Sequence, residues 1–114
     1  MAAVYVSNLV INTGATFTQK FSLENVSSNS ALELSGFGVR SEMRKHSGSV
    51  SAAATFTALI SDPAAGIIQV GLTSTTTAGI KPGRYVYDVI VVDSASEVTR
   101  VVEGSVLVRQ GVTR

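Results

Sequence analysis

Apolar and polar residues alternate along most of this chain with a period of two, which is the pattern of β-strands. The clearest run covers residues 81–93, where a Pro-Gly pair predicts a turn and an alternating segment follows it. Tyr85, Tyr87, Val89 and Val91 share one face of this segment, and the other face is almost as apolar. Two apolar faces are typical of a strand in the interior of a sheet, so we predict a central strand here.

Similar blocks rich in Val, Ile, Thr, Tyr and Phe recur between clusters of Gly, Asn, Ser and Pro. A threonine-rich passage at 73–80 is the one place where a helical turn fits. The pattern therefore predicts an all-β protein, a seven-stranded antiparallel immunoglobulin-like β-sandwich formed as a single domain by residues 1–114, with a closed barrel as the alternative. The predicted strands cover residues 3–11, 15–24, 36–44, 52–60, 67–72, 81–93 and 97–109.

Four residues of the central segment are predicted to hold the sandwich together. Gly83 belongs to the turn, and Tyr85 stands where a tyrosine corner places a hydroxyl that bonds back to the preceding loop. Tyr87 is expected to face the core. Asp88 lies within the most apolar strand, so it should be paired or at the sheet surface, with Arg100 or Arg40 on a neighbouring strand as its partner.

Two further segments carry structural predictions. The polar loop at 25–35 contains Leu32 and Leu34, which we expect to anchor it on the core. The last strand contains Gly104, which indicates a bulge or a close approach of another backbone segment. Its apolar residues are expected on one face: Val98, Val102, Val106 and Val108.

Composition narrows the class of protein further. Of the 114 residues 45% are hydrophobic and only 15% are charged, a low charged fraction that suits a protein in contact with neighbours. The net charge of +1 argues against nucleic-acid binding, which normally needs a clearly basic surface. The absence of cysteine excludes disulfides and thiolate metal sites. The sequence contains no run of 18 apolar residues, so no membrane span is predicted. The N-terminus lacks a signal-peptide pattern, so we expect the N-terminal segment to belong to the fold.

The residues that could support catalysis are few. His46 is the only histidine, and its Gly/Ser-rich surroundings beside Arg44 and Lys45 indicate an exposed loop. The carboxylates are scattered over different predicted strands and loops without metal-ligand spacing. We therefore expect no enzymatic activity, no cofactor and no metal. Arg40 and Arg44 lie on one face of a predicted strand, where a solvated face is favoured over a site for phosphate or an acidic partner.

Several short phrases occur in a fixed order along the chain: Val4-Tyr5-Val6-Ser7-Asn8, Ile11-Asn12-Thr13-Gly14, Phe17-Thr18-Gln19, Leu34-Ser35-Gly36-Phe37, Ser41-Glu42-Met43-Arg44-Lys45, Lys81-Pro82-Gly83-Arg84-Tyr85-Val86-Tyr87-Asp88, Glu103-Gly104 and Val112-Thr113-Arg114. Taken in order, these phrases resemble a family of small structural proteins of tailed bacteriophages, especially cyanophages, and the N-terminal domain of upper baseplate proteins. This resemblance implies an immunoglobulin-like virion component without enzymatic activity. The baseplate relatives continue into longer C-terminal regions whereas this sequence ends at Arg114, so a decoration protein on capsid or tail is a second expectation.

Together these observations predict a structural protein of the virion that docks in several symmetric copies on other virion proteins, and neither nucleic acid nor membrane is an expected partner. Edge strands and the two ends of the chain are the expected contact elements, because an edge can add to a partner's sheet. The alternative is a host-surface or glycan-binding module, which would need exposed aromatic residues. The expected contact residues are Val4, Tyr5, Arg40, Arg44 and Arg114.

Overall fold

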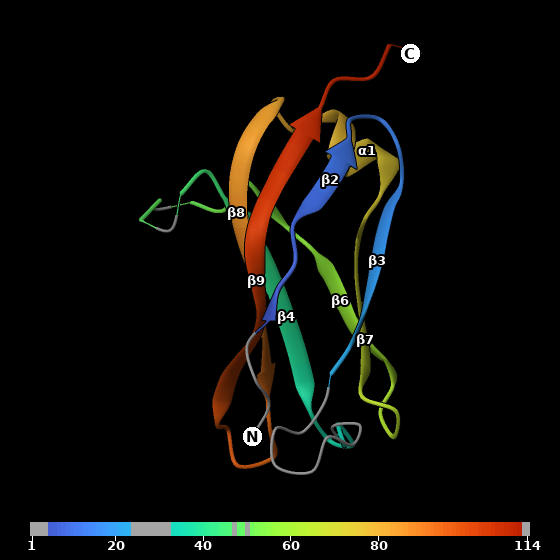
Figure 1. Ribbon diagram of the computed structural model, residues 1–114, viewed down its shortest axis with the longest axis vertical. Helices are drawn as coiled ribbons and strands as arrows, with labels where there is room; N and C mark the ends of the chain where they lie inside the picture. The colour runs from blue at the N-terminus through green and yellow to red at the C-terminus, as the bar shows by residue number, and fades with distance from the viewer. Residues whose placement is uncertain (1–4, 24–32, 47, 50, 113–114) are drawn as a thin grey trace.

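The computed structural model describes residues 5–23, 33–46, 48–49 and 51–112, which form two β-sheets and one short helix (Figure 1). The protein is therefore mostly β, as the alternation predicts. In chain order the elements are β1 (Tyr5–Val6), β2 (Leu9–Asn12), β3 (Phe17–Ser22), β4 (Gly38–Arg44), β5 (Ala54–Thr55), β6 (Thr57–Asp62), β7 (Ile67–Leu72), α1 (Ser74–Ala78), β8 (Gly83–Val92) and β9 (Val98–Arg109).

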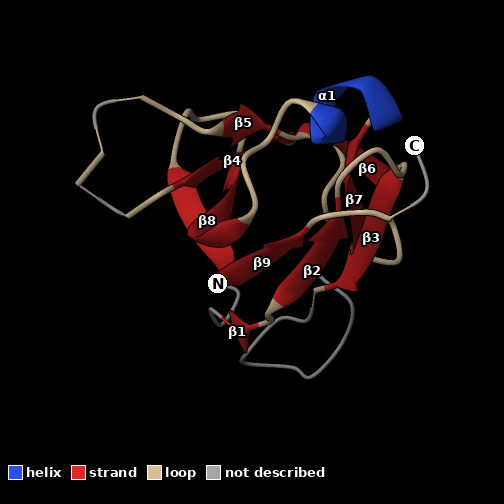
Figure 2. Cartoon of the chain, turned by 90° about the horizontal axis from the view of Figure 1, so that it is seen from above, coloured by secondary structure: helices blue, strands red, loops and turns tan. Residues whose placement is uncertain are grey.

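The larger sheet has the order β1-β9-β8-β4-β5, with β2 also paired to β9, and the smaller sheet has the order β3-β7-β6. Both β1 and β2 run parallel to β9, whereas the other pairs are antiparallel. The prediction of a wholly antiparallel fold is thus wrong for the N-terminal strands, because side-chain alternation carries no information on strand direction. Viewed from above, the larger sheet curls around the core and the smaller sheet closes the opposite side (Figure 2).

Two of the seven predicted strands are divided in the structure, which accounts for the nine strands in the described part of the chain. The first is interrupted at Ser7 and Asn8. The other is interrupted at Phe56, because β5 pairs with β4 in the larger sheet and β6 pairs with β7 in the smaller one. The chain therefore changes sheets at Phe56, whose amide still donates to the carbonyl of Ser41 over 2.9 Å.

The core lies between the two sheets and confirms the predicted faces of most strands. On β8, which lies between β9 and β4, the side chains of Tyr85, Tyr87, Val89 and Val91 are all buried. Ile68, Val70 and Leu72 face them from β7 in the smaller sheet. Burying each such side chain contributes about 1.5–3 kcal/mol, so the inner faces are the main source of stability.

The strand β9 departs from simple alternation. The register between β8 and β9 shifts between Val89 and Ile90, which leaves Val101 as an extra residue on β9. Val101 and Val102 are both fully buried, and Val98 turns outward with 54% of its surface exposed. The predicted shared face of Val98 and Val102 is therefore wrong, because a bulge reverses the alternation that follows it.

The loops confirm some predictions in detail. Leu34 is fully buried and anchors the loop before β4, while Leu32 lies outside the described residues. β4 begins at Gly38, since Gly36 has a φ of 80° and belongs to a turn. The helical turn expected at 73–80 is present as α1, and in the described part of the chain no helix is long and apolar enough to cross a bilayer.

Candidate functional site

The turn before β8 forms the hydrogen bond expected of a tyrosine corner. The hydroxyl of Tyr85 donates to the carbonyl of Lys81 over 2.6 Å. Gly83 has a φ of 148°, which side-chain-bearing residues rarely adopt, so glycine suits this turn. The ammonium of Lys45 lies 4.9 Å from the centre of the Tyr85 ring, which attracts the cation. Gly83 and Tyr85 therefore act in the architecture of this end of the two sheets.

A second contact between distant segments involves Tyr87 and the break between β1 and β2. The hydroxyl of Tyr87 donates to the carbonyl of Ser7 over 2.6 Å, and Gly104 lies directly opposite Tyr87 on β9. In a regular parallel ladder the amide of Ser105 would donate to the carbonyl of Ser7. Here it donates to the side-chain oxygen of Asn8 over 3.1 Å. The Asn8 side chain thus replaces the Ser7 carbonyl in the ladder to β9.

The Ser7 carbonyl can lie this close to β9 only because residue 104 is a glycine. A Cβ atom at Gly104 would stand 2.2 Å from the oxygen of Ser7, which is closer than two such atoms can approach. The close backbone approach predicted at Gly104 is confirmed, whereas the bulge lies three residues earlier, at Val101. The N-terminal segment is therefore held on the larger sheet by Gly104, Tyr87 and Asn8.

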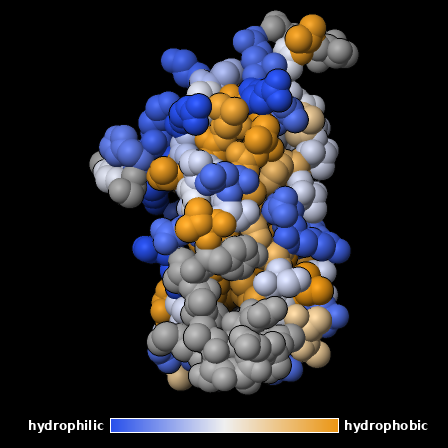
Figure 3. Space-filling view, viewed as in Figure 1, coloured by the Kyte–Doolittle hydropathy of each residue, from blue (hydrophilic) through white to orange (hydrophobic). Residues whose placement is uncertain are grey.

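The candidate site is the outer face of the larger sheet, where the register brings charged residues into rows. Glu42 lies opposite Asp88, and Asp88 lies opposite Glu103, so three carboxylates form one row across β4, β8 and β9 (the acidic row). The neighbouring row contains Arg40, Ile90 and Arg100 (the basic row). Hydrophobic and hydrophilic surface alternate over the part of this face formed by β2, β8 and β9 (Figure 3).

The bulge at Val101 is what aligns these rows. Arg100 and Glu103 are three residues apart, so regular alternation would place them on opposite faces of the sheet. The extra residue returns both side chains to the outer face, opposite Ile90 and Asp88 respectively. The acidic row was therefore not predicted from the sequence. The outward positions on β4 and β8 were visible in the alternation, but the register was not.

Ion pairs neutralise part of this face. As predicted, Asp88 lies at the surface and pairs with Arg100, whose Nε is 3.2 Å from Oδ2. Arg44 pairs with Glu42 over 3.0 Å. Among the described residues, the ion pairs of the face include neither Arg40 nor Glu103. One unpaired charge of each sign is therefore left in two adjacent rows.

A hollow of about 700 Å³ lies over the acidic row and is open to solvent. Arg44, His46 and Arg100 border it together with the apolar side chains of Val6 and Val86. Like charges placed directly opposite on neighbouring strands destabilise a sheet. The acidic row is therefore a local cost to the fold that a basic partner in the hollow would relieve.

The edge of the larger sheet at β2 is also available for contact. The amides of Ser7 and Thr13 donate to β9, each over 2.9 Å, so odd-numbered residues in between turn their backbone groups toward β9. Val10 accordingly turns its backbone N–H and C=O away from β9, where β2 has no second partner among the described strands. Its side chain is 50% exposed.

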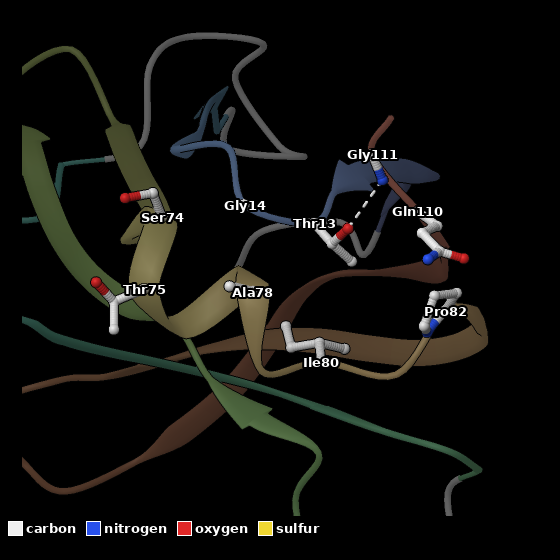
Figure 4. Close-up of a pocket in the computed structure, with 9 residues that line it drawn as sticks. All are labelled: Thr13, Gly14, Ser74, Thr75, Ala78, Ile80, Pro82, Gln110 and Gly111. Atoms are coloured by element: carbon white, nitrogen blue, oxygen red, sulfur yellow. Dashed lines mark hydrogen bonds between the residues drawn. The ribbon is translucent and has the colours of Figure 1, made fainter. Parts of the chain in front are cut away.

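A separate cavity of about 810 Å³ lies between α1 and the ends of β2 and β9 (Figure 4). None of its lining side chains is charged, and the amide of Gly111 donates to the hydroxyl of Thr13 over 3.0 Å. A lining without titratable side chains offers nothing to transfer protons. The lining residues are Thr13, Gly14, Ser74, Thr75, Ala78, Ile80, Pro82, Gln110 and Gly111.

The predicted contact residues do not form one cluster. Arg40 and Arg44 share the outer face of β4 as predicted, and His46 is exposed beside them. The backbone of Tyr5 pairs with Val102 on β9. Val4 and Arg114 lie outside the described residues. Within the described ranges, His, Asp and Glu side chains form no group of three or more that could hold a metal ion.

Comparisons with known families and curated proteins assign this chain to no class beyond its mostly β fold. No family model matches the chain, and no curated protein sequence matches it.

Proposed function

We propose that this chain is a non-catalytic structural protein of a tailed-phage virion that docks on tail, baseplate or capsid proteins in several copies. One observation carries the docking role. Of the six large hydrophobic side chains that are exposed in the described structure, Val6, Val10, Val86 and Val98 lie on the outer face of the larger sheet. Apolar side chains gathered on one face favour contact with another protein.

The strand order supports an immunoglobulin-like assignment within this proposal. If β3, β4, β6, β7, β8 and β9 are lettered B, C, D, E, F and G, the smaller sheet has the order B-E-D and the larger one contains G-F-C. These are the neighbours found in immunoglobulin domains, where sheets BED and CFG pack face to face. The Tyr85 corner hydrogen bond at the start of strand F adds a second feature of those domains.

The virion role is supported by the resemblance noted above and by where its strongest phrase lies. Residues 81–88 form the corner and the first half of the central strand, so the resemblance rests on the framework of the fold. The glycan-binding alternative has less support, because none of the six aromatic side chains described projects freely into solvent. Phe21, Phe56, Tyr85 and Tyr87 are buried, and Phe17 and Phe37 are half-buried against the core.

Quantitative mass spectrometry of purified particles from the phage that carries this gene tests the proposal. We expect the chain at a fixed number of copies relative to the major capsid protein, and we expect that ratio to survive further purification. A chain found only in the lysate and absent from particles would refute the virion role. Binding of the isolated protein to glycans or host cells would favour the alternative.

A further inference from the structure

We propose that the outer face of the larger sheet binds a second copy of this chain, with the acidic row of each copy covered by the basic row of the other. The inference goes beyond the virion role, since it depends only on the register and charges of the chain itself. Its physical basis is that adjacent rows carry opposite charge and lie two residues apart on β4 and β8, which corresponds to about 6.7 Å along a strand.

A two-fold axis parallel to the rows, between the acidic and basic rows, brings about this arrangement. Such an axis places each strand over the same strand of the partner in the opposite direction, and it exchanges the two rows. Glu103 of one copy then faces Arg100 of the other, and Arg40 faces Glu42. Each contact occurs twice, as a two-fold interface requires.

The charges that are unpaired within one copy become paired in the dimer. Arg40 and Glu103 take part in neither ion pair on this face. In the dimer both gain a partner of opposite sign, so two carboxylates of the acidic row, Glu42 and Glu103, face a cation over the hollow that they line. The third, Asp88, faces Ile90 of the other copy and keeps its ion pair with Arg100 of its own copy. A cation bound by the carboxylates alone is not the occupant we infer, because they form no metal-holding group in the described part of the chain.

The rows on either side of this centre are compatible with the same axis. Val86 lies one row beyond the acidic row, and Val92 lies one row beyond the basic row. The axis brings these two valines together across the interface, so apolar contacts flank the charged centre. An axis in the plane that keeps like rows together would oppose three carboxylates to three carboxylates, and like-charge repulsion disfavours that arrangement.

The curl of the larger sheet limits the contact to the neighbourhood of β4, β8 and β9 (Figure 2). A contact confined to three strands and made mainly of charged pairs is weak, so we expect a Kd in the micromolar range or weaker, with a strong dependence on salt. Weak pairing of this kind suits a protein that completes its contacts only at high local concentration.

Sedimentation velocity of the full chain over a wide concentration series, at low and high salt, tests the inference. The wild type should show a monomer–dimer equilibrium that salt weakens. Glu103→Arg places two pairs of like charges across the interface and should raise the Kd by about 100-fold. Lys20→Glu, an equal charge reversal on the outer face of the smaller sheet, should leave the Kd unchanged.

The decisive measurement mixes two variants. Arg100→Glu should dissociate the dimer like Glu103→Arg, yet an equimolar mixture of the two should form a one-to-one heterodimer with a Kd near that of the wild type. In that mixture, the arginine introduced at position 103 of one variant faces the glutamate introduced at position 100 of the other. The unchanged Arg100 of the first variant faces the unchanged Glu103 of the second, so every contact again joins opposite charges. A misfolded variant is distinguished by its denaturant unfolding, which should show Glu103→Arg at least as stable as the wild type because the substitution relieves the acidic row.

Two results would overturn the inference. The first is a wild type that stays monomeric throughout the concentration series, which would mean that this face does not bind a second copy of the chain. The second is a mixture of the two folded variants that fails to associate. Neither result bears on whether the chain is found in virions, so failure of the dimer and failure of the virion role are separable.

Discussion

Gly104→Ala should destabilise the protein far more than a glycine substitution at an ordinary strand position. The added Cβ atom would stand 2.2 Å from the oxygen and 2.8 Å from the carbonyl carbon of Ser7. These are backbone atoms, so relief requires the segment between β1 and β2 to move away from β9. That movement breaks the hydrogen bond from Tyr87 to Ser7 and displaces the Asn8 side chain from Ser105.

The magnitude follows from two contributions. Overpacking costs about 1–3 kcal/mol. Loss of the hydrogen bond between Tyr87 and Ser7 costs about 1 kcal/mol, so the free energy of unfolding should fall by about 2–4 kcal/mol in total. Because single domains are stable by about 5–15 kcal/mol, we expect the variant to fold and its stability to be measurable.

Equilibrium unfolding in urea, followed by far-ultraviolet circular dichroism, provides the measurement. Gly38→Ala is the matched control, since a Cβ atom at Gly38 meets no atom within 4 Å and the backbone there is not left-handed. It should leave the protein unchanged or stabilise it by up to about 1 kcal/mol. In a Tyr87→Phe background, Gly104→Ala should cost about 1 kcal/mol less, because the hydrogen bond is already lost. Equal stability of the Gly104 and Gly38 variants would refute the reasoning.

Three further predictions concern single contacts. Thr77→Val removes a fully buried hydroxyl that donates to the carbonyl of Ala15 over 2.8 Å, and the unpaired carbonyl should lower the unfolding free energy by about 1–3 kcal/mol in the same urea assay. Tyr85→Phe should cost about 1 kcal/mol through loss of the corner hydrogen bond, and a change below about 0.3 kcal/mol would contradict that role. Hydrogen bonds from the hydroxyl and then the amide of Ser35 hold the pKa of Glu33 below its usual range, so its contribution to stability is present above the unfolded-state pKa and is lost as pH falls through the folded one. Ser35→Ala should raise that pKa in an NMR titration, and an unchanged titration curve would exclude the serine as the cause.

Most strand positions could be predicted because burial on one face imposes a period of two on the sequence. The inward side chains of β8 and the inward leucine Leu34 followed from that period and from the position of the turns. A cation on a neighbouring strand also followed as the partner of Asp88, since a carboxylate on the central strand of a sheet needs one. The sequence left Arg100 and Arg40 as alternatives, and the structure shows that the partner is Arg100. Val98 was misplaced because nothing in the alternation marks the bulge at Val101.

The candidate site depended on information that a pattern along one strand does not contain. Glu42, Asp88 and Glu103 stand 46 and 15 residues apart in the sequence, and only strand pairing aligns them in one row. Parallel pairing of β1 and β2 with β9 was equally invisible, because alternation is the same in either direction. The division of the fourth predicted strand between two sheets also appeared only in the structure, because alternation does not indicate with which strand a segment pairs.

The sequence by itself determined that this protein is an all-β domain with a central strand preceded by a tyrosine corner, because local alternation, turn residues and the need to bury apolar side chains act over a few residues. The tertiary structure alone decided strand direction, the bulge at Val101, the contact of Ser7 with Tyr87 over Gly104, and the rows of opposite charge on the outer face. These features arise from the pairing of segments that are distant in the chain. Pairing is selected by the packing of the whole core, and no short stretch of sequence encodes it.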